Sequence, residues 1–371
     1  FAYVDFEEDY HVPSLEDAAM AFGTKIIRSF HDMENPVTDI VKKFNSMRKT
    51  GFEIPKIAFM PHSLKDVLAV FKQAESLKNS QQILCAMGPL GLPTRLLSEK
   101  LNSFLTYTSP SELLGNLLEI GHTDPFTLNN VYRYRKINEN TKIFGITGFP
   151  LKVTSSPELH NSNFENSNMN AVYIPFKSES IDDAMDFAKQ LNIKGFSVTI
   201  PHKETVIPLL REIDSEAEEI GACNTVINFN GTWKGYNTDC IGFEKALLEF
   251  SKLKNLKHKK VAIIGAGGAS RAICYEIKKL GGKACVFNRT LAKARLVAEK
   301  YGFEYATLGP ENLEKLRKYS DIIVQTTSKG MGATEQSNMD NDPIWFYDFN
   351  GKELVYDIVY SPDVTPIMAR A

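Results

Sequence analysis

The segment that most limits how this chain can fold runs from Lys259 to Thr290. It opens with an apolar, β-branched run from Val261 to Ile264, which predicts a buried strand of a parallel sheet. Three glycines follow at once (Gly265, Gly267 and Gly268), and a helical pattern then runs from Ala269 to Leu280. A second strand is predicted over Lys283 to Phe287. This order of strand, turn, helix and strand is typical of one half of a dinucleotide-binding sheet.

The glycine turn predicts a site for a phosphorylated nucleotide. Glycines allow a tight turn and a close backbone approach to a pyrophosphate, whose charge lies against the N–H groups at the start of the next helix. Arg289 follows the second strand, where an acidic residue would favour NAD, and its guanidinium suits a 2′-phosphate. We therefore expect NADP as the cofactor; the alternative is a glycine-rich turn without a ligand. The expected cofactor contacts are Gly265, Gly267, Gly268, Ala269, Asn288, Arg289 and Thr290.

The composition of the whole chain argues against several classes of protein. Its 371 residues suffice for two or three domains, and its net charge of −2, with both signs spread along the sequence, gives no reason to expect nucleic acid or an anionic membrane as a partner. No apolar run is long enough to span a bilayer, and no signal peptide is visible. The five cysteines lack paired spacing, so we expect reduced thiols in a cytoplasmic protein and no metal site.

From Phe1 to about Ile137, short apolar strands alternate with helical patterns, which indicates β/α units around a parallel sheet. His31 and Lys56 lie at strand ends or inside a strand, where such folds place chemical groups. Burial favours an uncharged amine that can form a Schiff base with a ketone, and a nearby histidine can move protons. A structural alternative remains open, in which Lys56 extends its charged end to solvent and the hydrogen bonds of His31 are made within the fold. Strands are predicted over Tyr3–Glu7, Lys25–Phe30, Lys56–Met60, Gln82–Met87 and Phe104–Thr108.

Three motifs of this first segment, SFHD, IPKIAFMP and GLPTRL, resemble the C-terminal half of the type I 3-dehydroquinate dehydratases. The resemblance implies that residues 1–137 form the C-terminal part of a (β/α)8 barrel. It also implies that Lys56 forms an imine with 3-dehydroquinate, that His31 is the acid and base, and that Arg95 holds the substrate carboxylate. The product would be 3-dehydroshikimate. Since the match begins within the family's barrel, we expect the strands that begin that barrel to be missing from this sequence.

Polar residues in the second segment, residues 141–243, follow or precede predicted strands and helices. Hydroxyls at a helix start are usually caps, and Asp239, just before an apolar helix, also fits an N-cap. Lys203 alone fits a solvated surface lysine. Together the set fits a polyol site in which a lysine and an aspartate share a proton and protonate the alkoxide formed from a ketone. Its members are Thr154, Ser156, Thr199, Lys203, Asn224 and Asp239.

These motifs, with the glycine unit, resemble shikimate dehydrogenases from about Lys142 onward. The resemblance implies an α/β substrate domain followed by a Rossmann NADP-binding domain over residues 244–371, which lacks the family's C-terminal helix. Lys203 and Asp239 would be the catalytic pair, with Thr154 and Ser156 on the substrate carboxylate. Thr199, Asn224 and Asp239 would contact the ring hydroxyls and Tyr360 would enclose the substrate, while Lys293, Thr326 and Thr327 would contact the cofactor.

The order of the two segments resembles the bifunctional dehydratase–dehydrogenase arrangement, in which the product of the first reaction is the substrate of the second. The expected overall activity is conversion of 3-dehydroquinate to 3-dehydroshikimate and NADPH-dependent reduction to shikimate. We expect a chain cut at both ends. The alternatives are a dehydrogenase that uses quinate and a sensor of pathway metabolites without turnover.

Overall fold

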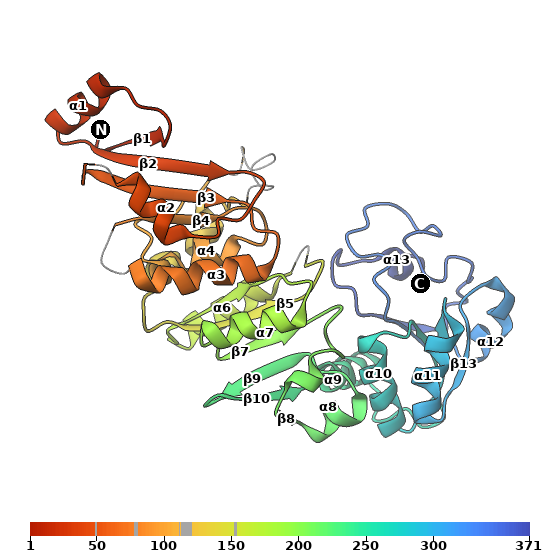
Figure 1. The fold of residues 1–371 in the computed structure, drawn as a ribbon. Coiled ribbons are helices and arrows are strands. Elements are labelled where there is room, and N and C mark those ends of the chain that lie inside the picture. The colour runs from red at the N-terminus through yellow and green to blue at the C-terminus, as the bar shows by residue number, and fades with distance from the viewer. Residues whose placement is uncertain (49, 78–80, 111, 113–120, 152–153) are drawn as a thin grey trace. The chain divides into compact units, whose positions relative to one another are not determined.

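The computed structural model describes residues 1–48, 50–77, 81–110, 112, 121–151 and 154–371 (Figure 1). The chain separates into two compact units. Unit 1 comprises Phe1–Arg211 with Val226–Trp233, and unit 2 comprises Glu212–Thr225 with Lys234–Ala371. Within the described ranges, none of the helices combines the length and the apolarity that a bilayer crossing needs.

The N-terminal part of unit 1 is a parallel sheet with strand order β1-β2-β3-β4. Helices follow its strands because each parallel strand starts at the same end of the sheet, and a crossover helix carries the chain back to that end. Helix α3 begins at a capping box, in which Ser63 and Asp66 exchange side-chain and backbone hydrogen bonds. The elements are β1 (Tyr3–Glu7), α1 (Pro13–Ala21), β2 (Lys25–Asp32), α2 (Ile40–Met47), β3 (Glu53–Phe59), α3 (Leu64–Ala74), β4 (Ile83–Ala86) and α4 (Leu92–Leu96).

The predicted strand over Phe104–Thr108 is wrong. The chain there forms one isolated bridge, between Gln82 and Ser103, and the amide of Phe104 donates to the carbonyl of Gln82 at 2.7 Å. The amide of Leu84 donates instead to the side-chain hydroxyl of Ser103 at 3.0 Å. Because this hydroxyl takes the donor that a longer ladder would use, regular pairing stops after one bridge.

The second part of unit 1 contains the parallel strands in the order β6-β5-β7, followed by β9. Helix α7 packs against α3 of the preceding sheet, where Phe71 and Phe187 meet edge to face with ring centroids 5.9 Å apart. Both rings are buried, so the two parts of this unit share an apolar contact. The elements are β5 (Lys142–Thr147), α6 (Ser156–Asn166), β6 (Ala171–Pro175), α7 (Ile181–Gln190), β7 (Gly195–Val198) and β9 (Thr225–Phe229).

Unit 2 is built around a parallel sheet with strand order β13-β12-β11-β14-β15, which is the order of a dinucleotide-binding sheet without its sixth strand. Its central strand β11 has four successive buried residues and pairs with both β12 and β14. The elements are β8 (Glu212–Ile213), α8 (Ser215–Ile220), α9 (Asp239–Ser251), β11 (Lys260–Ile264), α10 (Gly268–Lys279), β12 (Lys283–Asn288), α11 (Leu291–Tyr301), β13 (Glu304–Thr307), α12 (Leu313–Lys318), β14 (Ile322–Gln325), β15 (Leu354–Asp357) and α13 (Pro366–Arg370). Strand β10 (Thr232–Tyr236) crosses the division between the units and pairs with β8.

Candidate active sites

His31 and Lys56 lie on the neighbouring strands β2 and β3, two positions apart in register, since Ser29 pairs with Lys56 and His31 with Ala58. Residues two apart on a strand share a face, so both side chains face the same side of the sheet. Lys56 is 8% exposed, and its Nζ lies 3.1 Å from Asp5 Oδ2 and 4.6 Å from the ring centroid of Tyr107. The structure therefore holds the amine in an enclosed position beside one carboxylate.

Two acidic partners on β1, Asp5 and Glu7, escaped the sequence analysis. Glu7 Oε1 lies 2.7 Å from His31 Nδ1, and the carboxylate of Asp5 accepts a hydrogen bond from Ser29 as well as from Lys56. Their spacing of two residues on a predicted strand places both on one face, and this signal could have identified them. Burial, reinforced by the charge of Asp5, raises the pKa of Tyr107, so this phenol is neutral and can donate a hydrogen bond.

Arg95 lies in the short helix α4 after β4 and is 3% exposed. Its charge and that of Lys56 act on two neighbouring groups. They moderate the raised pKa of the Cys85 thiol, whose main cause is burial, and they add to the effect of burial in lowering the pKa of His122. The predicted residues Lys56 and Arg95 therefore act electrostatically on the same small region of unit 1.

The hydroxyls of Thr154 and Ser156 meet before and at the start of α6. Thr154 Oγ1 donates to Ser156 Oγ at 3.0 Å and accepts from the Ser156 amide at 3.2 Å. Ser155, the N-cap residue, makes no side-chain capping bond. The alternative from the sequence was that these hydroxyls only cap the helix. Capping accounts for the hydrogen bond from the Ser156 amide to the Thr154 hydroxyl, but not for the orientation of the Ser156 hydroxyl.

Thr199 and Lys203 follow the carboxyl end of β7, in a turn that is anchored at both ends. The Thr199 amide donates to the Thr147 carbonyl at 3.0 Å, and the buried His202 ring lies 2.8 Å from the Ser178 carbonyl. A Cβ added to Gly148 would lie 2.4 Å from the Thr199 methyl carbon, so only glycine lets the chain after β5 approach the Thr199 side chain this closely. Lys203 therefore lies on an anchored turn beyond the carboxyl end of β7.

Asn224 and Asp239 are brought together in unit 2. Asn224 Nδ2 donates to Asp239 Oδ1 at 2.6 Å, and its Oδ1 accepts from the Thr238 amide at 2.9 Å. The capping role that the sequence allowed for Asp239 is wrong, because Asp239 is already the first residue of α9 and Thr238 is the N-cap residue. The carboxylate therefore has its orientation set by an amide, while Lys203 belongs to unit 1.

The glycine turn between β11 and α10 leaves the space that a phosphate needs. Gly265 has φ of +116°, and a Cβ there would lie 2.5 Å from Thr326 Oγ1, whereas a Cβ on Gly267 would meet nothing within 4 Å. Ser270, at the third fingerprint position, is buried and donates to the Gly267 carbonyl at 2.6 Å. Its hydroxyl is thus satisfied within the helix, and the first-turn N–H groups of α10 border an open cradle that fits a pyrophosphate.

The end of β12 fits the adenosine side of the same cofactor. Asn288 Nδ2 donates to the Thr290 carbonyl at 3.0 Å, which shapes the turn into α11. Arg289 and Lys293 are both exposed, so two cationic side chains are accessible where the ribose hydroxyl or its phosphate would lie. Ala269, by contrast, lies inside the first turn of α10 and contributes its backbone amide only.

The loop after β14 carries the predicted contacts Thr326 and Thr327. Thr326 Oγ1 donates to the Ile264 carbonyl at 2.8 Å, and the Thr327 amide donates to Gln325 Oε1 at 2.7 Å. Tyr360 follows β15 and is 61% exposed, so the described fold leaves its ring available to a ligand.

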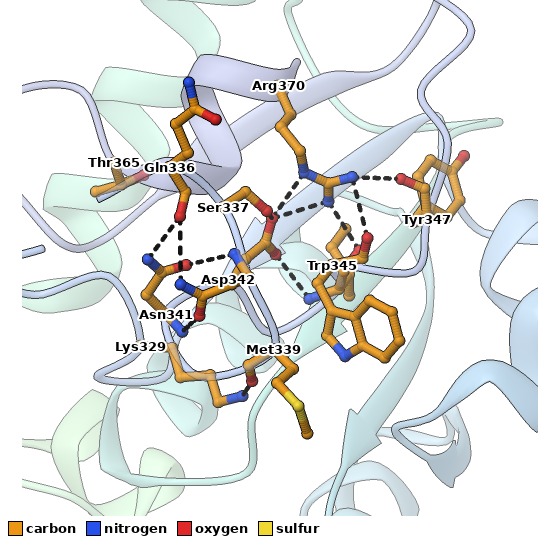
Figure 2. A network of polar contacts seen from close by, with 12 residues as sticks. Lys329, Gln336, Ser337, Met339, Asn341, Asp342, Trp345, Tyr347, Thr365 and Arg370 are labelled. Atoms are coloured by element: carbon orange, nitrogen blue, oxygen red, sulfur yellow. Dashed lines mark hydrogen bonds and ion pairs between the residues drawn. The ribbon is translucent and has the colours of Figure 1, made fainter. Parts of the chain in front are cut away.

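Figure 2 shows how the chain beyond this loop is fastened to α13. Asp342 is fully buried, and its Oδ2 lies 2.8 Å from both Nε and Nη2 of Arg370. The guanidinium also donates to the carbonyls of Ile344 and Tyr347 at 2.8 Å. Lys329 Nζ donates to the Met339 carbonyl at 2.5 Å, which ties the loop after β14 to the same network. Across the described residues, no group of three or more His, Cys, Asp or Glu side chains could hold a metal ion.

The phosphate cradle at a helix start, on a sheet with the dinucleotide-binding strand order, is the arrangement with which nicotinamide-dependent oxidoreductases bind their cofactor. Three family models match the chain: the type I 3-dehydroquinases over residues 1–139, the shikimate dehydrogenase substrate-binding domain over 146–226, and the shikimate/quinate 5-dehydrogenases over 247–369. The chain belongs to the shikimate dehydrogenase family, and the residues before that part match the type I 3-dehydroquinase family model.

Individual relatives agree with this assignment. The NADP+-dependent shikimate dehydrogenase of Caldanaerobacter subterraneus is 41% identical over 245 residues, which cover 64% of this chain and 84% of the relative. The chloroplastic bifunctional 3-dehydroquinate dehydratase/shikimate dehydrogenase of Arabidopsis thaliana is 31% identical over 363 residues, covering 94% of this chain but 59% of the relative. The crystal structure of Aquifex aeolicus shikimate dehydrogenase has a TM-score of 0.55 and 38% identity, and the match covers 63% of this chain and 84% of that one.

Proposed function

We propose that this enzyme reduces 3-dehydroshikimate to shikimate with NADPH, and that Lys203 and Asp239 are its catalytic pair. The observation that carries the proposal is the Asp239 carboxylate at the start of α9, held by the Asn224 amide at 2.6 Å. An aligned carboxylate beside an amide donor fits a cyclic polyol, because the amide and the carboxylate can engage neighbouring hydroxyls of one ring.

Each residue has a separate task in the proposed reaction. Bound NADPH supplies the hydride that reaches the ketone carbon. The ammonium of Lys203 would stabilise the negative charge that develops on the carbonyl oxygen and would donate a proton to it. Asp239 accepts a hydrogen bond from the ring. Thr199 and Asn224 orient the ring hydroxyls, and Thr154 with Ser156 hold the carboxylate.

Following NADPH oxidation with 3-dehydroshikimate tests this assignment. We expect Lys203→Ala to lower kcat about 10²- to 10⁴-fold, the range that a positioned acid or base supplies. Lys189→Ala is the matched control, because Lys189 is an exposed lysine of α7 whose ion pair with Asp186 spans 3.4 Å. Equal rates for the two variants would refute the role of Lys203.

For the N-terminal segment we propose Schiff-base dehydration of 3-dehydroquinate, with Lys56 as the imine-forming amine and His31 as the proton carrier. Support comes from the enclosed position of Lys56 and from the contact of His31 with Glu7 at 2.7 Å, which orients the ring. Arg95 would hold the carboxylate. Borohydride reduction in the presence of 3-dehydroquinate should add a stable mass to Lys56 and none to a Lys56→Ala variant, and absence of the adduct would reduce this segment to a structural role.

The remaining parts of the proposal concern substrates, domains and location. We propose 3-dehydroquinate, 3-dehydroshikimate and shikimate as the small-molecule partners, and domains at 1–137, 141–243 and 244–371. Quinate is a second candidate substrate because one matching family is described as shikimate/quinate 5-dehydrogenase; comparing the rates of NADP+ reduction with quinate and shikimate decides between them. The five cysteines are buried, which supports a reducing compartment such as the cytoplasm, although the Arabidopsis relative is named as chloroplastic.

A further inference from the structure

Tyr173 occupies a central place among the elements that carry the proposed carboxylate contacts. It lies on β6 and is 3% exposed. Asn161 of α6 donates to the Tyr173 carbonyl at 2.9 Å and accepts from its amide at 2.7 Å, and the His160 ring stacks on the phenol ring with centroids 4.2 Å apart. These contacts fix α6, and with it Ser156 at its start, against the tyrosine.

The phenol hydroxyl of Tyr173 links two other hydroxyls. It donates to Ser197 Oγ on β7 at 2.7 Å. Burial raises the pKa of Tyr173 to about 12, and the neighbouring hydroxyls of Ser197 and Ser156 oppose that rise. With Thr154 Oγ1 donating to Ser156 at 3.0 Å, four hydroxyls from three elements lie in one row.

Ser197 lies at the end of this row and beside the substrate contacts. It is half-buried on β7 and stands two residues before Thr199, which directly follows that strand. A hydroxyl that accepts one hydrogen bond still has its own proton to donate. Since Ser197 accepts from Tyr173, its proton is directed to an acceptor outside the row.

We propose that Ser197 is a further specificity residue for the substrate carboxylate and that Tyr173 is the positioning residue that orders Ser197 and Ser156. The inference rests on the proposed function and extends the Thr154–Ser156 pair to a row of four hydroxyls. His160 beside the row has a pKa lowered by burial and is neutral at pH 7. The row therefore recognises the carboxylate through neutral donors alone, so its selectivity depends on how many of them are aligned.

The test compares 3-dehydroshikimate with its methyl ester, which keeps the ketone and loses the charge. For Tyr173→Phe and Ser197→Ala we expect the KM for the acid to rise about 5- to 20-fold, the effect of losing one or two aligned donors. The KM for the ester and the KM for NADPH should each change less than about twofold. Ser197→Thr, which keeps the hydroxyl, should restore the KM for the acid.

Tyr301→Phe is the matched control, because its buried hydroxyl has no hydrogen-bond partner among the described residues and lies in α11 of unit 2. An unchanged KM for the acid in both row variants would overturn the inference, and so would a parallel rise for acid and ester, which a structural role produces. The proposed function fails separately if the wild-type chain oxidises no NADPH with 3-dehydroshikimate. In that case calorimetric binding of shikimate to wild type and Ser197→Ala still decides the inference, since equal affinities overturn it.

Discussion

Replacing Arg370 by Met should destabilise the nucleotide-binding unit through a single buried charge. The substitution keeps an apolar stem of similar length but leaves the fully buried carboxylate of Asp342 without the cation that contacts it twice at 2.8 Å (Figure 2). Removing one partner of a buried ion pair costs about 3–5 kcal/mol, and the partial exposure of Arg370, at 25% of its side chain, places the expected loss near 3 kcal/mol. The carbonyls of Ile344 and Tyr347 lose a donor in the same step.

The assay is thermal and urea unfolding of four proteins: wild type, Arg370→Met, Asp342→Asn and the double variant. A loss of about 3 kcal/mol corresponds to a Tm lower by about 6–12 °C in a domain of 150–250 residues. Asp342→Asn keeps an acceptor for the Ile344 amide, which donates to Asp342 Oδ1 at 2.8 Å. The double variant should therefore lose at least about 1 kcal/mol less than the sum of the single losses. A single-variant loss below about 1 kcal/mol, or strict additivity, would refute the reasoning.

Three further outcomes follow from the same structure. Arg289→Ala should raise the KM for NADPH about 10-fold or more and leave the KM for NADH nearly unchanged, since only the 2′-phosphate needs the guanidinium; parallel changes in steady-state kinetics would contradict this. A hydrogen bond from Tyr319 and two lysines lower the pKa of Glu304 from 4.5 to about 2, so its stabilising effect is complete above pH 4.5 and is lost as the pH falls toward 2. Acid unfolding should shift to higher pH in Tyr319→Phe, and an unchanged midpoint would count against that contact. Tyr301→Phe removes a buried hydroxyl that has no partner among the described residues, so unfolding should show an unchanged or higher Tm, and a loss above about 1 kcal/mol would show that the hydroxyl is satisfied.

The dinucleotide unit was predictable almost to the residue. A strand predicted over Val261–Ile264 is observed as Lys260–Ile264, and a helix predicted from Ala269 begins at Gly268. The agreement has a physical cause, because a strand buried on both faces, a glycine turn and an amphipathic helix each leave a separate local pattern. The Asn224–Asp239 contact had no such pattern, since the two residues are fifteen positions apart and meet only through the turn between β9 and β10 and the start of α9.

The N-terminal segment shows where local patterns fail. Strand Tyr3–Glu7 was predicted with the correct bounds, yet the roles of Asp5 and Glu7 depend on which neighbour the strand acquires. The misassigned strand at Phe104–Thr108 was apolar enough to pair, and the hydroxyl of Ser103 ended the pairing. Both outcomes depend on tertiary partners, which periodicity within one segment does not encode.

Strand β1 meets only β2 among the described strands, and it carries the two carboxylates that face Lys56 and His31. Local opening of one strand costs less free energy than global unfolding. Each local opening of β1 removes both counter-charges at once, while the intact β2–β3 pairing keeps the lysine and the histidine on one side of the sheet. The reactivity of the amine is thereby coupled to the local opening equilibrium of five residues, so amide exchange in Tyr3–Glu7 and imine formation at Lys56 should respond together to temperature and denaturant.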